Sequence, residues 1–507
     1  MKIIPVCLII ACLAGTAAPA DWPTFGGDPQ RSGFARGESI LNKDSVQTLE
    51  VKWKLQLDNV PKELTSLTAP VTVDQVKTPR GIKEFVIAAG SSDTIYAVDA
   101  DAGKLAWKRS FTVEGKPTRE PNTLCPFAVN ATPVVQSGRL KTVHMISIDG
   151  KLHALNVEDG EDRFAPAPFV PGFSKNWSLN IVNNVLYTAL SQRCNGVMSG
   201  VYSLDLNDPQ HTVRSFEAGR PGIWGRAGVA ISTASGKVFA ETGDGTFDPA
   251  AGQYADTFLA LSAKDLKLLD YYTPANREWL TRKDLDMGNV TPVVISYKGH
   301  EFLVGGGKEG RLFALDTASL GGESHRQPAF RSELLANEDT NYSGSGFWGS
   351  FATFEDSKGT RWLYAPAWGP PHSAALPSFP VTNGLAAHGS IMAFRLELKD
   401  NAPVLIPAWI SADLDVPEPP IVANGVVYAL SSGEDVRQYH AGTKERLQGS
   451  RKATLHAFDS ETGKELFVSQ PLSSFSHFGG IALSNGRIFV TTYDGYMFAF
   501  GPKHEER

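Results

Sequence analysis

The stretch Ile95–Trp107, IYAVDADAGKLAW, contains the pattern that decides the fold. Apolar residues alternate as far as Asp99, a turn with a glycine follows at Asp101–Gly103, and a second short apolar run ends at Trp107. Alternation with a period of two is typical of a half-buried strand, and a short turn with glycine joins antiparallel strands. The stretch therefore predicts a strand, a tight turn and a second strand.

The same pattern returns along the chain. Two further strong copies are LHALNVEDGEDRF over residues 152–164 and LHAFDSETGKELF over residues 455–467. In each strong copy a small residue is followed by a turn glycine six positions later and by a bulky aromatic residue ten positions later. The three sets are Ala97, Gly103 and Trp107; Ala154, Gly160 and Phe164; and Ala457, Gly463 and Phe467. Weaker copies carry Ser203, Ala260, Ala314, Ala393 and Ala499 as the small residue.

Eight strand-only repeats at intervals of 42 to 79 residues indicate a β-propeller, whose blades repeat every 40–50 residues or so. We predict an all-β, eight-bladed β-propeller of four-stranded antiparallel blades, with the small residues where strands crowd near the axis. The alternating stretch Leu49–Leu57 should pair with the blade that ends at Phe500. This N-terminal strand would close the ring and leave no exposed sheet edge.

The first twenty residues, Met1–Ala20, have the features of an export signal. Lys2 supplies a positive charge, Ile3–Ala14 is an apolar run too short to span a bilayer, and Ala18–Ala20 is a small-residue cleavage site. In a competing interpretation, Ile9–Cys12 resembles a lipoprotein box, although the lipidated Cys12 would lie unusually early. We therefore expect an exported, periplasmic or secreted protein with no transmembrane span.

Residues 21–507 are expected to form a single propeller domain. Cleavage of the signal would leave Cys125 and Cys194, which could pair in an oxidising compartment or remain two separate buried thiols. The formal net charge is −6, without a long run of one sign. This charge distribution gives no indication of a nucleic acid or an anionic membrane as partner.

The longest interval, from Ala314 to Ala393, predicts a loop insertion at about residues 320–390. Its tryptophans favour a packed cap over a surface excursion without a role; they are Trp348, Trp362 and Trp368, in or beside the irregular stretches Ser343–Trp348 and Ala365–Pro380. The polar stretch Gly433–Lys452 is predicted to be a solvated loop. Four scattered histidines without metal-ligand spacing are predicted to lie on the surface or in loops: His372, His388, His440 and His477.

With the repeats, the opening stretch Asp21–Gly33, DWPTFGGDPQRSG, and the DxxxGKxxW-like turn resemble the quinoprotein propeller family. Its best-known members are the alcohol dehydrogenases that depend on pyrroloquinoline quinone (PQQ), and it also includes non-enzymatic envelope propellers. The resemblance implies oxidation of an alcohol, polyol or sugar by hydride transfer to PQQ beside calcium, with an external electron acceptor. The alternative is a non-catalytic scaffold that binds proteins or glycans.

Three stretches resemble the active-site regions of these enzymes. In GIWGRAGVAIS, Trp224 stands where the family places a tryptophan under the flat quinone; the alternative is a core tryptophan. In VFAETGDGTFD, the resemblance implies that Thr242 contacts the cofactor and that Asp244 replaces a calcium-binding asparagine. A carboxylate oxygen suits calcium, and the alternative for Asp244 is an ordinary polar turn.

The third region is KDLDMGNVTPVV followed by VGGGKEGRLFALD. Here Asp284 matches the general base beside calcium, with Asp286 as the less favoured choice, and Lys308 matches a cation on the quinone oxygens. A carboxylate can take the hydroxyl proton while hydride passes to the quinone, and a cation stabilises the negative charge that develops there. The alternative places Lys308 in an ordinary hairpin turn.

The sequence also departs from the family pattern. The dehydrogenases usually have a glutamate calcium ligand where this chain has no acidic residue between Leu190 and Tyr202. The chain lacks the adjacent cysteine pair that many members hold against the quinone, and it has no CxxCH haem motif. Since calcium affinity follows the number of charged ligands, the missing glutamate weakens the expected metal site. No GxSxG, HExxH or P-loop motif points to another chemistry.

Overall fold

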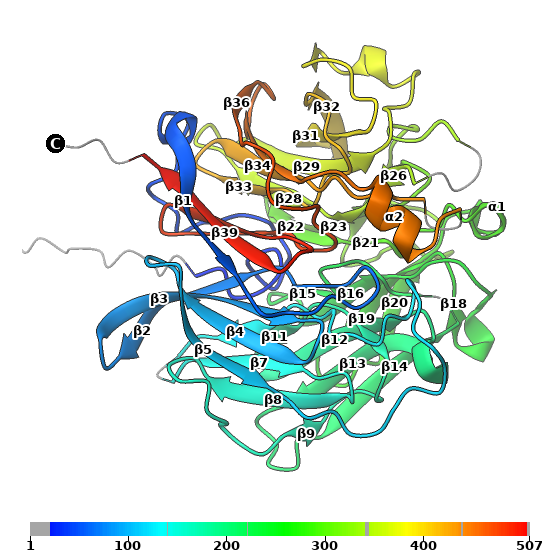
Figure 1. Ribbon diagram of the computed structural model, residues 1–507. Helices are drawn as coiled ribbons and strands as arrows, with labels where there is room; N and C mark the ends of the chain where they lie inside the picture. The colour runs from blue at the N-terminus through cyan, green and yellow to red at the C-terminus, as the bar shows by residue number, and fades with distance from the viewer. Residues whose placement is uncertain (1–20, 139, 221, 340–343, 438–439, 504–507) are drawn as a thin grey trace, which may run out of the picture.

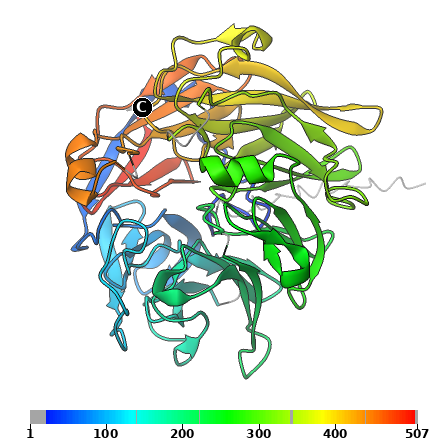
Figure 2. The same cartoon turned by 90° about the vertical axis from the view of Figure 1, so that its right-hand side faces the viewer.

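Each repeat folds into a blade, and the blades are arranged around the centre of a ring, with the strands of each blade following one another outwards (Figure 1; Figure 2). The computed structural model describes residues 21–503 except 139, 221, 340–343 and 438–439. Within this part of the chain, eight sheets of four or more strands form the ring, so the predicted eight-bladed β-propeller is confirmed. The predicted signal Met1–Ala20 lies outside the described residues.

The strands of the first four blades follow one another along the chain. Blade 1 contains β2 (Val71–Thr78), β3 (Gly81–Gly90), β4 (Thr94–Asp99) and β5 (Lys104–Ser110). Blade 2 contains β6 (Val134–Gln136), β7 (Thr142–Ile146), β8 (Lys151–Asn156) and β9 (Ala167–Pro168). In blade 3, β10 (Lys175–Asn176) and β11 (Asn180–Val182) both pair with β12 (Val185–Ser191), which is followed by β13 (Ser199–Asp205) and β14 (Val213–Gly219). Blade 4 contains β15 (Ala230–Ser232), β16 (Lys237–Glu241), β19 (Phe258–Ser262) and β20 (Leu268–Tyr272).

The remaining blades complete the circle. Blade 5 contains β22 (Val293–Tyr297), β23 (His300–Gly306), β24 (Leu312–Asp316) and β25 (Phe330–Arg331). In blade 6, β26 (Gly346–Phe347) and β28 (Ala352–Glu355) pair with β29 (Arg361–Trp368), followed by β31 (Gly389–Lys399), β32 (Ala402–Ile410) and the parallel β30 (Val381–Thr382). Blade 7 contains β33 (Ile421–Ala423), β34 (Val426–Ser431), β35 (Thr454–Asp459) and β36 (Glu465–Val468). Blade 8 contains β37 (Ile481–Ser484), β38 (Arg487–Thr491), β39 (Tyr496–Pro502) and β1 (Leu49–Gln56).

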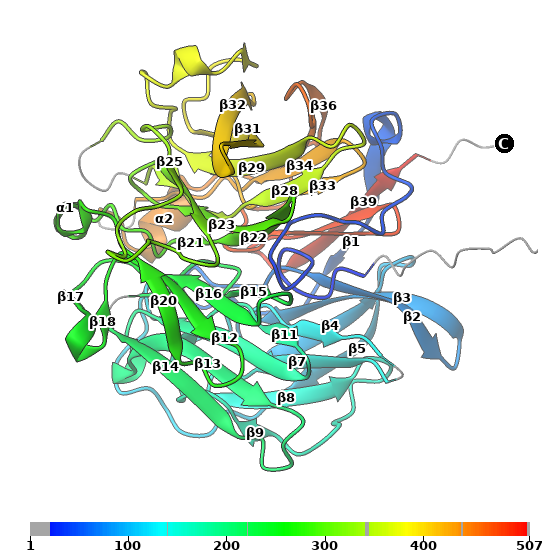
Figure 3. The same cartoon turned by 180° about the vertical axis from the view of Figure 1, so that it is seen from behind.

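Short elements lie between the blade strands. A hairpin of β17 (Phe247–Asp248) and β18 (Gln253–Tyr254) follows β16, and β21 (Val290–Thr291) pairs in parallel with β27 (Gly349–Ser350). The helices α1 (Arg277–Lys283) and α2 (Thr443–Gly449) lie at the same end of the ring, on the right in Figure 1 and on the left in Figure 3. Single 3-10 turns cover Ser45–Thr48, Cys194–Gly196, Pro249–Ala251 and Leu376–Ser378. No helix of the described residues is long and apolar enough to cross a bilayer.

The ring closes as the sequence predicts. Strand β1 pairs antiparallel with β39, and Val51 lies opposite Phe500. The two strands run side by side in Figures 1 and 3. The last blade therefore combines the two ends of the chain, and the main-chain hydrogen bonds between them hold the ring shut.

The prediction for the small residues is wrong in one respect. The first strands of successive blades, such as β2 and β6, contact one another and so surround the axis. The small residues instead lie on the third strand of each blade, as Ala97 does in β4. Ala97 is fully buried in a cluster with Val143 and Met145 of blade 2. Small size therefore serves the packing between neighbouring sheets, because the larger side chains of the next blade fill the space.

The fixed offsets of the repeat arise because each blade docks on the next. Trp53 of β1 lies over the turn glycine Gly103 and donates its Nε1 hydrogen to the carbonyl of Ala100 at 2.8 Å. Trp107 lies in the same way over Gly160, and Trp409 of blade 6 over Gly463; each also donates its Nε1 hydrogen to a backbone carbonyl of that turn. A Cβ atom at any of the three glycines would come within 2.7 Å of the indole ring. The turn must therefore be glycine wherever the neighbouring blade docks through tryptophan.

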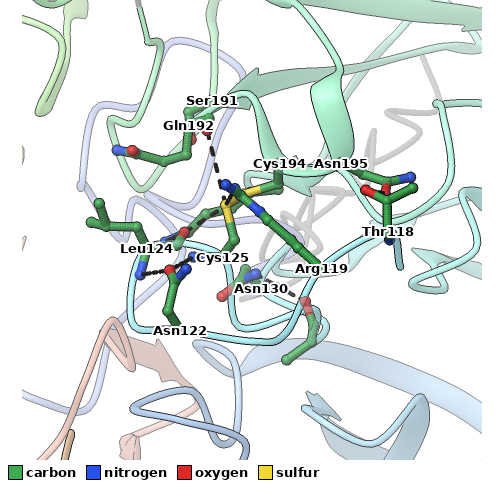
Figure 4. Close-up of a disulfide and its surroundings, with 12 residues drawn as sticks. Thr118, Arg119, Asn122, Leu124, Cys125, Asn130, Ser191, Gln192, Cys194 and Asn195 are labelled. Carbon is green, nitrogen blue, oxygen red and sulfur yellow. Dashed lines mark hydrogen bonds between the residues drawn. A yellow bond between two sulfur atoms is a disulfide. The ribbon is translucent and has the colours of Figure 1, made fainter. Parts of the chain in front are cut away.

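Cys125 and Cys194 form a disulfide with a Cα–Cα distance of 5.6 Å (Figure 4). The bond joins the link between blades 1 and 2 to the β12–β13 turn of blade 3, across 69 positions of sequence. Of the two alternatives that the sequence leaves open, the paired one is therefore present.

The predictions for the irregular stretches are corrected in part. Trp348 stacks on Trp368 with ring centroids 4.2 Å apart, as a packed cap requires, but Trp362 belongs to strand β29 of blade 6. The stretch 433–452 is not simply a solvated loop, because it forms α2 and buries Glu434 and Arg446. Its charged composition suggested exposure, whereas an ion pair lets both side chains be buried.

Candidate active site

A cavity of about 430 Å³ is lined by Arg446 of α2 and by Asp284, which caps α1, so it lies at the end of the ring that carries both helices. Its volume lies within the range of sites that hold small organic ligands, about 300–1,000 Å³. Side chains of blades 3 to 7 and of the links between blades line it, so it lies over the ring axis. The sequence-predicted residues Trp224, Asp244, Asp284 and Lys308 all contribute to its wall.

Trp224 forms a flat aromatic part of the cavity wall. Its backbone N–H donates to the carbonyl of Gly288 at 2.9 Å. The indole ring lies against Gly222 and Gly243, where an added Cβ would approach ring atoms to 1.8 and 2.6 Å. The two glycines therefore give the ring space to lie close to the backbone, while it remains partly exposed in the cavity.

Lys308 is bonded to two carboxylates beside this ring. Its Nζ lies 2.7 Å from Asp284 Oδ1 and 2.6 Å from Asp286 Oδ1. The same Nζ lies 5.8 Å from the ring centroid of Trp224 and 5.6 Å from that of Trp348. The backbone N–H of Lys308 donates to the carbonyl of Asp286 at 3.1 Å, which fixes the lysine loop against the aspartate loop.

The charges of this group depend on one another. Burial alone lowers the pKa of Lys308, but Asp286 and Asp284 outweigh burial, so the net pKa lies above its usual value and the ammonium stays charged. Burial, together with Asp244 and Asp284, raises the pKa of Asp286 to about 6 against the opposing effect of Lys308. Asp286 is fully buried, whereas Asp284 is partly exposed to the cavity.

Asp284 is presented by the end of a helix that the sequence did not predict. It caps α1 in the left-handed conformation with φ 53°, which costs an L-residue other than glycine about 1 kcal/mol. Thr281 of the same helix donates to the buried Asp256 Oδ2 at 2.7 Å. An unfavourable backbone geometry held by a buried contact is typical of functional positions.

The two remaining predicted residues behave differently. Asp244 lines the cavity, and burial and then Asp284 raise its pKa while Lys308 opposes the shift. Thr242 does not line the cavity, because its side chain is fully buried and donates to the backbone carbonyls of Tyr254 and Thr257. A direct contact from Thr242 to a ligand in the cavity is therefore not supported.

The carboxylates do not make a calcium cage. Calcium takes about six to eight oxygen ligands. Within the described residues, no group of three or more His, Cys, Asp or Glu side chains is arranged to hold a metal ion. The Lys308 ammonium already bonds an oxygen of Asp284 and an oxygen of Asp286, and it takes up carboxylate oxygens that a calcium ion would need. The arrangement therefore does not fit the metal predicted for Asp244 and Asp284.

A second charged group lines the same cavity, and the sequence analysis missed it. Arg226 pairs with Glu418, and Arg446 pairs with Glu434 at 2.5 Å. His477 Nδ1 also lies 2.7 Å from Glu434 Oε1. These side chains are all buried or nearly so. We call them, together with Lys175, the basic wall; the group of Asp244, Asp284, Asp286 and Lys308 is the acidic wall.

Aromatic rings separate and support the two walls. The guanidinium carbon of Arg226 lies 4.2 Å from the ring centroid of Phe478 and 5.3 Å from that of Trp368. Lys175 Nζ lies 5.2 Å from the ring centroid of Trp177. Trp177, Trp224, Trp348 and Phe478 line the cavity and give it flat apolar surfaces beside the charged groups. Such a site suits a planar ligand with negatively charged substituents.

The fold and site place the chain among eight-bladed propellers with an axial, aromatic cavity. Residues 22–183 match the model of a PQQ family described as the β-propeller domain of glucose, ethanol and alcohol dehydrogenases. No curated protein matches the sequence at the level of significance applied. The resemblance to quinoprotein propellers is confirmed by this match and by the fold.

Solved structures share the architecture at low sequence identity. The quinohemoprotein alcohol dehydrogenase of Comamonas testosteroni is similar with a TM-score of 0.60 and 14% identity, covering 97% of this chain and 82% of that one. A europium-containing methanol dehydrogenase has a TM-score of 0.60 and 13% identity, covering 96% and 98%. The Sqt1 protein of Saccharomyces cerevisiae has a TM-score of 0.52 and 10% identity, covering 89% and 99%. At such identities the likeness shows the fold, and activity must be argued from the site.

Proposed function

We propose that this chain is an exported, PQQ-dependent dehydrogenase that oxidises a hydroxyl group of an alcohol, polyol or sugar. One observation carries the proposal: Lys308 Nζ is bonded to Asp284 Oδ1 at 2.7 Å beside the Trp224 ring. A carboxylate, a cation and an aromatic surface thus meet in one cavity. These are the groups that oxidation of an alcohol by a planar quinone requires.

The cavity supports the binding of PQQ, which is flat and carries three carboxylates. Trp224 offers a ring on which such a molecule can stack, and Trp348 offers a second ring nearby. Lys308, which lies beside the Trp224 ring, would face the quinone oxygens. Stacking and charge-assisted hydrogen bonds would together fix the orientation of the molecule.

The reaction removes a proton from the hydroxyl oxygen of the substrate and a hydride from the adjacent carbon, leaving a carbonyl. When bound, PQQ supplies the acceptor for the hydride. Asp284 is the group that would accept the hydroxyl proton, since its carboxylate faces the cavity and Lys308 bonds only its Oδ1 among the described contacts. Lys308 stays protonated and stabilises negative charge on nearby oxygens.

A non-catalytic propeller that binds proteins or glycans in the cell envelope is the alternative. The specific observation in its favour is that the described carboxylates form no calcium cage. In that case the cavity would bind a ligand but would not catalyse the oxidation of a substrate. Binding and turnover must therefore be measured separately.

The test titrates the purified chain with PQQ, with and without calcium, and follows quenching of tryptophan fluorescence. Dye-linked oxidation of alcohols, polyols and sugars is then measured. We expect saturation at micromolar PQQ and turnover. Asp284→Asn should keep the PQQ affinity within about threefold and lower kcat by about 10²–10⁴-fold. Asp265→Asn, in the β19–β20 turn on the outside of blade 4, is the matched control.

The outcomes separate the candidates. Absence of quenching at tens of micromolar PQQ would remove the enzyme, and so would turnover that Asp284→Asn leaves unchanged. Binding of PQQ without turnover of any substrate would favour the non-catalytic propeller. Export is tested by fractionating cells that express the full chain: the proposal expects a mature protein that starts at Asp21 outside the cytoplasm and delivers electrons to an external acceptor.

A further inference from the structure

The basic wall holds more positive charge than its carboxylates compensate. Among the described residues, the buried carboxylates that partner Lys175, Arg226 and Arg446 are Glu418 and Glu434. Burial lowers the pKa of His477 despite Glu434, so this histidine adds no charge at neutral pH. One cation therefore remains in excess, and burying an uncompensated charge is costly unless a ligand of opposite sign joins it.

Lys175 is the cation without a carboxylate of its own. Its Nζ donates to the carbonyl of Leu124 at 3.0 Å, and no Asp or Glu oxygen of the described residues lies within ion-pair distance. The side chain is 6% exposed and lines the cavity. An ammonium has three donors, so Lys175 keeps capacity for a ligand beyond its bond to Leu124.

Arg226 also has an unused donor. Its Nη1 bonds Glu418, whereas its buried Nη2 has no hydrogen-bond partner. Arg226 is 4% exposed and lines the same cavity as Lys175. A guanidinium that keeps a free donor beside an ammonium is a ready site for a carboxylate, which accepts several charge-assisted hydrogen bonds.

We propose that Lys175, Arg226 and Arg446 form a carboxylate-binding subsite, and that the substrate of this propeller is a hydroxy acid or sugar acid rather than a neutral alcohol. The opposite charge of the acidic wall gives such a substrate one orientation. Its carboxylate is attracted to Lys175 and repelled by Asp244 and Asp284, so the hydroxyl end faces Asp284. The inference rests on the proposed function only in calling the ligand a substrate.

The experiment compares D-glucuronate with D-glucuronamide, which has the same shape without the negative charge. Calorimetric titration of the purified full chain without PQQ measures both affinities. The proposal expects glucuronate to bind at least tenfold more tightly than the amide. Affinities within twofold of each other would overturn it, and this comparison requires no variant.

Lys175→Met then assigns the preference to the basic wall. It should remove most of the discrimination between acid and amide, whereas Lys267→Met, on an exposed turn of blade 4, should leave it unchanged. Circular dichroism and the melting temperature confirm that each variant is folded. Discrimination that survives Lys175→Met would overturn the assignment to this wall.

A carboxylate in this subsite could belong to PQQ instead of the substrate, and a PQQ titration of Lys175→Met distinguishes the sources. Lost glucuronate affinity with PQQ affinity kept within threefold supports the substrate. If Lys175→Met lowered the affinities for glucuronate and for PQQ equally, the basic wall would bind the quinone, and the proposal that the substrate is an acid would be wrong. Glucuronate binding in a protein that never binds PQQ would support the subsite and remove the proposed dehydrogenase.

Discussion

Lys308 and Lys175 line one cavity and are both almost completely buried, yet their electrostatic surroundings differ. Lys308 is bonded to Asp284 and Asp286, and those carboxylates outweigh burial and raise its pKa. Lys175 bonds a backbone carbonyl, and burial, with the nearby Arg446, lowers its pKa to about 7. Buried cations of one residue type thus have different roles: Lys308 is compensated by the protein, whereas Lys175 is left for a ligand.

The largest effect is expected from removing each lysine in turn. Lys308→Met leaves the buried Asp286 without its cation, and breaking a buried pair in this way costs about 3–5 kcal/mol of unfolding free energy. Lys175→Met removes an uncompensated charge and should be neutral or stabilising. Urea unfolding of both variants measures the difference. If the two variants lost the same unfolding free energy, Lys308 and Lys175 would not differ in how far the protein compensates their charge.

A smaller effect is expected from the disulfide. Replacing Cys125 and Cys194 by alanine opens a loop closed across 69 positions, and stability should fall by about 2–4 kcal/mol. The bond lies next to Leu124, whose carbonyl holds Lys175, and next to Gln192 and Arg193, which line the cavity.

This change should therefore weaken the basic wall and leave the acidic wall intact. Glucuronate affinity should drop, while PQQ-induced quenching at Trp224 should change little. Dithiothreitol treatment of the unmodified chain provides the same comparison without mutation. A loss of quinone affinity equal to the loss of glucuronate affinity would mean that the disulfide supports the whole cavity.

The contrast between the walls also explains what the sequence could reveal. The blades were predictable because Gly103 and Trp107 keep fixed offsets, which the docking of successive blades requires. Trp224 and Lys308 were found through short motifs beside such repeats. Lys175 in β10 and Arg446 in α2, by contrast, are 271 positions apart, and no local pattern shows that these two elements meet at one cavity.

Other predictions failed for similar reasons. The charged stretch around Glu434 resembles a solvated loop until its partners Arg446 and His477 are known. Arg226 left a signal in the sequence, a lone charge in the apolar run GIWGRAGVAIS, two residues after Trp224. Such a charge suggests a buried partner or a ligand, but its partner Glu418 is 192 positions away.

The smallest and most specific effect is expected from pH. Because the pKa of Lys175 is about 7 in the folded chain, its charge is lost as the pH rises above neutrality. The charged neighbours are Arg446 and Glu434, and the pKa of Glu434 is lowered because His477 and Arg446 outweigh the raising effect of burial. Glucuronate affinity should therefore decrease between pH 6 and pH 9, by at most about tenfold per pH unit.

Stability should change with pH in the opposite direction. A lysine whose folded pKa lies below the unfolded value of 10.5 destabilises the fold at low pH, and this cost is relieved as pH rises from about 7 towards 10.5. The Lys175→Met variant should lose both dependences, whereas Lys267→Met should keep them. Calorimetric titrations at pH 6, 7, 8 and 9 measure the change in glucuronate affinity, and urea unfolding at the same pH values measures the change in stability. If the glucuronate affinity of the unmodified chain did not depend on pH, a group other than Lys175 would supply the binding charge.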